Sequence, residues 1–185
     1  KKETKRKIYF TLFQEKELVT LPLQTVIGAL LNYICTAQVK SFQPVNSNYG
    51  ILPNRSKDKM EVKDNSLNSL KEWIDKQLAM RSCLVVLVGY ETSERKWVKY
   101  EIEKAMELHK GIVGIRIDRL KNASGEQDNE GCNPFFNVIT PSGHRLSNYV
   151  TLFKSSYYSS EYVYKDIKEH IEDLIEDAIN NRWNY

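Results

Sequence analysis

The sequence contains few glycines, and none of them stands where the common nucleotide-binding and hydrolase motifs need one. Eight of its 185 residues are glycine. After the first apolar run the chain reads FTLFQEKE, without the G-x-G-x-x-G of a dinucleotide-binding Rossmann domain. It has no G-x-x-x-x-G-K-[ST] phosphate loop and no G-x-S-x-G nucleophile elbow. A Rossmann dehydrogenase, a P-loop nucleotidase and an α/β-hydrolase are therefore excluded.

Cysteine and histidine are also scarce. The three cysteines, an odd number, are widely separated, and the three histidines are scattered along the chain. Such spacing provides neither a disulfide framework nor a zinc site. We therefore expect a reducing, cytoplasmic setting, no metal and no cofactor. The residues concerned are Cys35, Cys83, Cys132, His109, His144 and His170.

Long apolar runs and a strong charge imbalance are absent as well. No run approaches the roughly 18 residues of a membrane span, and no secretory leader is visible. The net charge is +3, and much of it comes from KKETKRK at residues 1–7. We expect a solvated basic tail there, with no membrane and no nucleic-acid partner. Nucleic-acid binding through residues 1–7 is the weaker alternative.

Strand-like and helical segments alternate along the rest of the chain. The clearest is CLVVLVG (83–89), a continuous apolar run typical of a strand covered on both faces. A helix follows it, with Ser93 as the expected N-cap. Further strands are expected at 7–13, 38–45, 111–117 and 149–153, helices at 23–34, 64–78 and 164–178, and a loop at 46–63.

This order predicts an α/β fold, specifically a flavodoxin-like, doubly wound parallel sheet of about five strands in the order 2-1-3-4-5. It forms a single domain over residues 8–185. Ligands of such sheets bind beyond the carboxyl ends of the strands, where the strand order reverses. Here we expect that crevice between the loops 13–20 and 89–95.

A polar insertion at 118–148 interrupts this pattern. A loop of such length in a compact domain usually has a task. Because aromatic rings are costly to leave in water, we expect Phe135 and Phe136 to anchor it, with residues 122–131 as a mobile tip. The insertion would then lie at the rim of the crevice, covering substrate or meeting a second subunit.

One carboxylate in the helix after strand 83–89 is out of place. With 100° per residue, the apolar side chains from Trp97 onward share an arc of roughly 180°. Glu101 falls inside this arc, about 40° from Trp97. An unpaired buried charge is very costly, so Glu101 must be protonated, paired or open to a cleft. A pairing with Lys104 or another lysine would make its role structural.

The segment LVVLVGYETSERKWVKYEIEKAMELHKGIVGIRI (84–117) resembles the TIR domain. It is most similar to the bacterial TIR-like (ThsB-like) branch of Thoeris anti-phage defence systems. The shared features are the apolar third strand ending in glycine, the polar loop, W-x-x-x-E (97–101) and the glycine-led next strand. NPF at 133–135 also suits this branch, whereas FTLFQEKEL departs from it after the first strand.

The resemblance implies an enzyme that cleaves NAD at the nicotinamide–ribose bond and makes a cyclic ADP-ribose-type signal. Its catalytic carboxylate would be Glu101, and Thr11, Phe13 and Trp97 would contact the substrate. One carboxylate suffices, because it can stabilise an oxocarbenium-like ribose while nicotinamide leaves unaided. NAD would be the substrate, without metal. Self-association and a downstream effector activated by the product are also implied.

The alternative is a non-catalytic TIR-like interaction module, since some TIR domains signal by association alone. In that case Glu101 belongs to a structural ion pair and the sheet and helices serve as association surfaces. Trp97 has its own alternative, in which it packs against the wall of the pocket and does not stack on the substrate.

Overall fold

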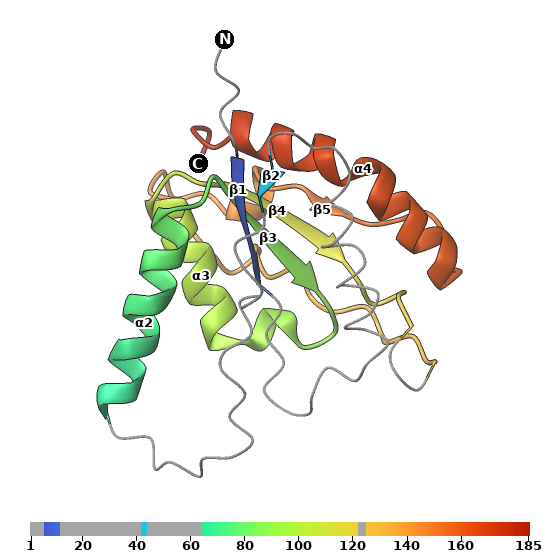
Figure 1. Cartoon of the computed structure of the whole chain (residues 1–185), viewed down its shortest axis with the longest axis horizontal. Coiled ribbons are helices and arrows are strands. Elements are labelled where there is room, and N and C mark those ends of the chain that lie inside the picture. The colour runs from blue at the N-terminus through green and yellow to red at the C-terminus, as the bar shows by residue number, and fades with distance from the viewer. Residues whose placement is uncertain (1–5, 12–41, 44–63, 122–124) are drawn as a thin grey trace.

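The computed structural model of the chain describes residues 6–11, 42–43, 64–121 and 125–185, with side chains from Lys71 onward except Trp73 (Figure 1). Several expectations lie outside the described residues. They are residues 1–5 of the basic tail, the helix at 23–34, the loop at 46–63, Phe13 with the loop 13–20, and residues 122–124 of the insertion.

The strand β3 (Cys83–Val88) is the centre of the sheet. All six of its residues are buried, as its unbroken apolar sequence predicts. It pairs in parallel with β1 (Arg6–Thr11) on one side and with β4 (Gly111–Arg116) on the other. Two-residue strands complete the sheet, β2 (Phe42–Gln43) beside β1 and β5 (Leu152–Phe153) beside β4. The strand order is β2-β1-β3-β4-β5, and the α/β class is confirmed.

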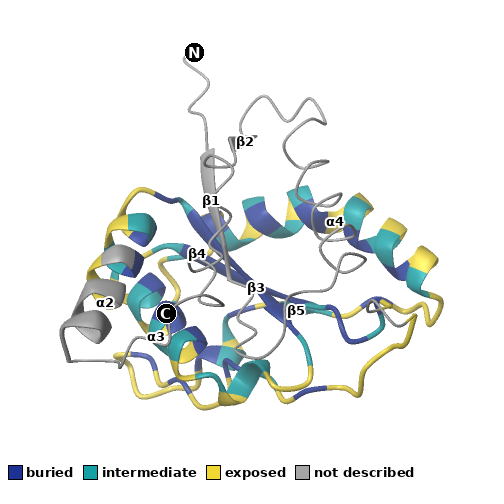
Figure 2. Cartoon of the chain, turned by 60° about the horizontal axis from the view of Figure 1, so that its bottom comes forward, coloured by how far each residue is buried: buried dark blue, intermediate teal, exposed yellow. Residues whose placement is uncertain are grey.

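Alternate residues of β3 enter two separate hydrophobic cores, because successive side chains of a strand point to opposite faces. Cys83, Val85 and Leu87 pack with α4 (Ser160–Asn180). Their neighbours Leu84, Val86 and Val88 pack with α2 (Asp64–Ala79) and α3 (Lys96–Glu107). Figure 2 shows the buried residues of the sheet and helices facing one another.

The helices follow their apolar spacing. In α2, Ile74 and Leu78 are fully buried, as predicted. In α4 the buried stripe consists of five β-branched residues, and Tyr164, Leu174 and Ala178 are partly buried at its edges. The stripe is Val163, Ile167, Ile171, Ile175 and Ile179. No helix among the described residues has the length and apolarity to cross a membrane.

The last strand is shorter than predicted. The expected strand at 149–153 contains only Leu152 and Phe153 in the sheet. The amides of Tyr149 and Val150 instead donate to the Leu146 carbonyl, at 3.0 and 3.1 Å, which closes a short 3-10 turn, η2 (Leu146–Asn148). These two amides therefore form their hydrogen bonds within the turn and do not pair with β4.

A hydrogen bond joins α2 to α3. The Tyr100 hydroxyl donates to Asp75 Oδ1 at 2.7 Å. Burial, together with this hydrogen bond, raises the pKa of Tyr100 to about 12. Below the ordinary tyrosine pKa near 10 the hydroxyl is protonated in both the folded and the unfolded chain, so its stabilising contribution is complete. Between pH 10 and 12 it ionises only in the unfolded chain, and the contribution is lost.

We expect Tyr100→Phe to lower the free energy of unfolding by about 1 kcal/mol at pH 8. The difference from the natural protein should shrink as the pH rises above 10, because only the natural protein then loses this contribution. Urea unfolding at pH 8, 10 and 11 measures both effects. Tyr162→Phe, whose ring is exposed on α4, is the matched control. An equal difference at pH 8 and pH 11 would show that Tyr100 is not the titrating group.

Candidate functional site

Glu101 lies on the buried face of α3. Only 2% of its surface is exposed, and it shares the face with Val98, Ile102 and Ala105, which are also buried. The position inside the apolar arc is therefore confirmed. Spacings of three and four residues bring these side chains onto one face, and the core around the helix fixes that face against the sheet.

The loop between β3 and α3 is held by its own hydrogen bonds. Thr92 Oγ1 accepts a hydrogen bond from the Gly89 amide at 2.9 Å and donates to the Leu87 carbonyl at 3.4 Å. The Thr92 amide donates back to the Gly89 carbonyl at 3.3 Å. The residues that follow form a single 3-10 turn, η1 (Thr92–Glu94).

The prediction that Ser93 caps α3 is wrong. The N-cap is Arg95, whose extended backbone (φ −77°, ψ 114°) precedes the first helical residue. Ser93 lies inside the 3-10 turn, which is closed by the hydrogen bond from the Arg95 amide to the Thr92 carbonyl at 3.3 Å. Arg95 also pairs with Glu91 at 2.5 Å. The turn therefore delays the start of the helix by two residues beyond the predicted position.

Trp97 packs against the core beneath α3. It is partly buried, and its ring meets Tyr100 edge to face with the centroids 5.9 Å apart. The Lys96 ammonium lies 5.9 Å from the Trp97 ring centroid. Lys104, one of the candidate partners for Glu101, forms an ion pair with Glu107 at 3.0 Å. Trp97 thus packs beside Tyr100 on α3, and its contact with a substrate stays a prediction.

Thr11 ends β1 beside β3, in register with Val86. The strand β3 continues to Val88, two residues beyond this pair, and β1 separates β2 from β3 in the sheet. This is the point at which the strand order reverses and where ligands of such sheets bind. The structure therefore brings Thr11 to the same edge as the β3–α3 loop. Phe13 lies outside the described residues, so its place in the site stays a prediction.

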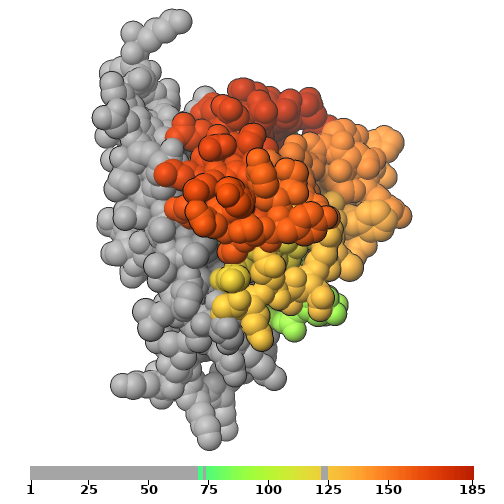
Figure 3. All heavy atoms as spheres, turned by 90° about the vertical axis from the view of Figure 1, so that its right-hand side faces the viewer, coloured from blue at the N-terminus to red at the C-terminus, as the bar shows by residue number. Residues whose placement is uncertain are grey.

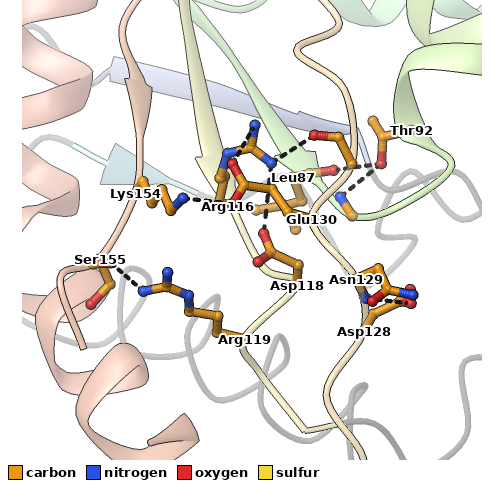
Figure 4. A network of polar contacts seen from close by, with 12 residues as sticks. Leu87, Thr92, Arg116, Asp118, Arg119, Asp128, Asn129, Glu130, Lys154 and Ser155 are labelled. Carbon is orange, nitrogen blue, oxygen red and sulfur yellow. Dashed lines mark hydrogen bonds and ion pairs between the residues drawn. The ribbon is translucent and has the colours of Figure 1, made fainter. Parts of the chain in front are cut away.

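A network of charges lies beyond the carboxyl end of β4 (Figure 4). The Arg116 guanidinium donates to the Gly131 carbonyl at 2.8 Å and lies 3.3 Å from Glu130 and 3.8 Å from Asp118. Lys154 holds the other oxygen of Glu130 at 2.5 Å. Burial raises the pKa of Asp118, whereas the hydrogen bond from Lys154 holds the pKa of Glu130 below its ordinary value.

Sequence reasoning missed this network. The only signal was the RIDR at 116–119, where charges directly follow a buried strand. Nothing in the sequence links Arg116 to Glu130 or Lys154, because turns of the insertion bring them together. In the space-filling view, described residues of the insertion border α4 and light-green residues of the segment after β3 (Figure 3).

Phe135 anchors the insertion on the sheet. Its side chain is completely buried and lies over Gly114 of β4, where a Cβ atom would come within 2.6 Å of the ring. The expectation for Phe136 is wrong, because this ring is 48% exposed and lies under the Arg145 guanidinium, 3.8 Å from its centroid. Neighbouring residues of a turn point in different directions, so only one ring of the pair can reach the sheet.

The described residues define a class of protein, a parallel α/β domain whose central strand leads into a helix with a buried carboxylate. Comparison with known families is more specific. Residues 34–122 match the family described as Thoeris protein ThsB, TIR-like domain. Over residues 34–122, slightly under half of its length, the chain is similar to a ThsB TIR-like domain, and the resemblance is confirmed. The matched residues include Trp97 and Glu101, whereas Thr11, Phe13 and most of the insertion fall outside them.

Two kinds of curated protein are similar to parts of this chain. The first is the "Putative cyclic ADP-D-ribose synthase ThsB1" of Bacillus cereus (strain MSX-D12), 39% identical over 75 residues, which cover 40% of this chain and 39% of the relative. The second is the methylenetetrahydrofolate–tRNA-(uracil-5-)-methyltransferase TrmFO. Its Desulforamulus reducens form is 41% identical over 73 residues, 36% of this chain and 17% of the relative.

The TrmFO of Halalkalibacterium halodurans is 53% identical over 51 residues, 26% of this chain and 12% of the relative. The chain thus spans well under half the length of each of these three relatives. Similarity that covers only 17% or 12% of TrmFO does not show that this chain shares the activity of TrmFO.

We expect Phe135→Ala to lower the free energy of unfolding by about 3–5 kcal/mol, because it empties a fully buried ring site on Gly114. Phe136→Ala, the adjacent control, should cost less than about 1 kcal/mol, since its ring is half exposed. Chemical denaturation of both variants measures the difference. Similar losses for the two variants would mean that Phe135 is not the anchor.

Proposed function

We propose that the protein cleaves NAD at the nicotinamide–ribose bond, with Glu101 as the catalytic carboxylate. The observation that carries the proposal is the burial of Glu101, 2% exposed, on the helix that leaves the central strand at the point of order reversal. The match of residues 34–122 to the ThsB TIR-like family supports it, as does the similarity to the Bacillus cereus relative named as a putative cyclic ADP-D-ribose synthase.

The chemistry requires one well-placed negative charge. When the bond between the ribose C1′ and the nicotinamide nitrogen breaks, both electrons go to the nitrogen, and nicotinamide leaves neutral. The ribose becomes an oxocarbenium-like cation. A carboxylate held in a site shielded from water stabilises this cation more strongly than it could in bulk water. The burial of Glu101 beside Val98, Ile102 and Ala105 on the same helix face supports such a setting.

The proposal extends to the whole protein. A flavodoxin-like, doubly wound single domain over residues 8–185 would bind NAD between the loops 13–20 and 89–95, with Thr11, Phe13 and Trp97 at the substrate. Attack by water on the ribosyl cation, with loss of a proton, would give ADP-ribose. Attack by a nucleophile of the same molecule would give a cyclic ADP-ribose-type signal. The protein would act in the cytoplasm, without cofactor or metal, after self-association, and its product would activate an effector.

A non-catalytic interaction module is the second candidate. The observation in its favour is a group of large exposed side chains, among them Tyr158 at 75% and Trp183 at 66% exposure. Exposed apolar surface of this kind often marks a protein interface. Under this proposal Glu101 would only stabilise α3.

Glu101→Gln should abolish NAD cleavage while the fold is retained. We expect a fall of about 10²–10³-fold in kcat, the usual cost of removing one group that stabilises charge in the transition state. Concentrated protein is incubated with NAD, and chromatography follows nicotinamide together with ADP-ribose or its cyclic isomer. Glu103→Gln, an exposed carboxylate on the same helix, is the matched control.

Thermal unfolding of the same variants separates the two candidate functions. An enzyme loses turnover in Glu101→Gln and keeps its melting temperature within a few degrees. A scaffold has no turnover in the natural protein, and its Glu101→Gln variant loses stability or self-association. Equal turnover by Glu101→Gln and the natural protein would remove Glu101 from the mechanism.

A further inference from the structure

Glu130 and Gly131, in the insertion, are assigned by the structure as positioning residues for NAD binding. We infer that they hold the loop 89–95 between β3 and α3 in the shape that receives the substrate. This inference rests on the proposed function. It assigns a part in the site to a segment that lies outside the residues matched by the family.

Gly131 lies directly against the backbone of the β3–α3 loop. It is buried, and a Cβ atom at this position would lie 2.2 Å from the Gly89 carbonyl oxygen and 2.6 Å from that of Tyr90. Backbone atoms cannot move aside as the end of a flexible side chain can. Only glycine permits this contact, so the fit between the insertion and the loop depends on the missing side chain.

The contacted carbonyl belongs to the hydrogen bonds that shape the loop. The Gly89 oxygen accepts the Thr92 amide at 3.3 Å, and the Gly89 amide donates to Thr92 Oγ1 at 2.9 Å. Any displacement at Gly131 would therefore disturb the hydrogen bond between the Thr92 amide and the Gly89 carbonyl, at the start of the turn η1 (Thr92–Glu94). The loop that follows β3 is thus supported from outside by the insertion.

Charges hold Gly131 in this place. The Arg116 guanidinium, largely buried at the end of β4, donates to the Gly131 carbonyl and pairs with Glu130. Lys154, just after β5, pairs with the second oxygen of Glu130. Figure 4 shows the Glu130 carboxylate between the two cations. Two strands of the sheet thereby fix residues 130–131, and these residues in turn fix the loop.

The loop should bind substrate because of where it begins. It leaves the carboxyl end of β3, next to the end of β1 at Thr11, at the point where the strand order reverses. A shift of about 1 Å in a substrate-positioning segment can cost a large part of its contribution to binding and orientation. The neighbours of Glu101 on the buried face of α3, Val98, Ile102 and Ala105, belong to the core between that helix and the sheet.

Hydrogen exchange tests the structural half of the inference without any activity. In Gly131→Ala and in Glu130→Gln, the amides of Thr92, Glu94 and Arg95 should exchange at least about fivefold faster, because the turn they close has lost its support. Exchange in β3 and α4 should not change. Gly143→Asn and Asp128→Asn are the controls. A Cβ atom at Gly143 meets nothing within 4 Å, and the Asp128 carboxylate, among the described residues, accepts only the amide of its neighbour Asn129.

NAD affinity tests the functional half. In the Glu101→Gln background, where NAD stays intact, adding Glu130→Gln should raise the Kd for NAD about threefold or more, and Asp128→Asn should leave it unchanged. In the active protein, Glu130→Gln should raise KM and leave kcat within about twofold, the reverse of Glu101→Gln. Glu130→Gln is the informative variant if Gly131→Ala fails to fold.

The outcomes separate this inference from the proposed function. Faster loop exchange in Glu130→Gln with unchanged Kd and KM would overturn the assignment to substrate binding. Unchanged exchange in Glu130→Gln would overturn the support of the loop, whatever the kinetics. If the natural protein neither binds nor cleaves NAD but loop exchange rises as expected, the proposed function fails and the structural support of the loop stands.

Discussion

The burial of β3 on both faces is the constraint on which the rest of the structure depends. A strand with six apolar side chains can be stable only if helices cover both sides of the sheet. Its alternate residues therefore join two cores, one with α4 and one with α2 and α3. This double cover buries β3 along its whole length. The proposed site lies at its carboxyl end, where the β3–α3 loop emerges.

The position of Glu101 follows from the same constraint. The helix α3 must turn Val98, Ile102 and Ala105 toward the sheet, and Glu101 is carried onto that face with them. Burying a carboxylate costs free energy unless pairing or hydrogen bonding compensates for it. Groups in such environments cluster at functional sites and also occur in structural ion pairs. The proposed NAD chemistry would use the charge in the low-dielectric environment that makes it costly.

The insertion gives the β3–α3 loop a support in addition to the hydrogen bond between Thr92 and Leu87 of β3. Phe135 fills the space above Gly114, and Arg116 and Lys154 hold Glu130. Between these anchors Gly131 meets the backbone of the β3–α3 loop. The surface ion pairs are individually weak. Their effect on the loop depends on the close packing at Gly131, where no side chain could be accommodated.

The sequence by itself determined the α/β class, the extents of β3, β4, α2 and α4 to within a few residues, and the buried place of Glu101, because each depends on local apolar periodicity. It misplaced the first residues of α3 and of β5. At both places a short 3-10 turn competes with the helix or the strand for the same backbone amides. Only the tertiary structure decided that Phe135 is buried and Phe136 exposed. It alone decided that Glu130 meets Arg116 and Lys154, and that Gly131 touches Gly89. These contacts join residues distant in sequence, and no local pattern specifies them.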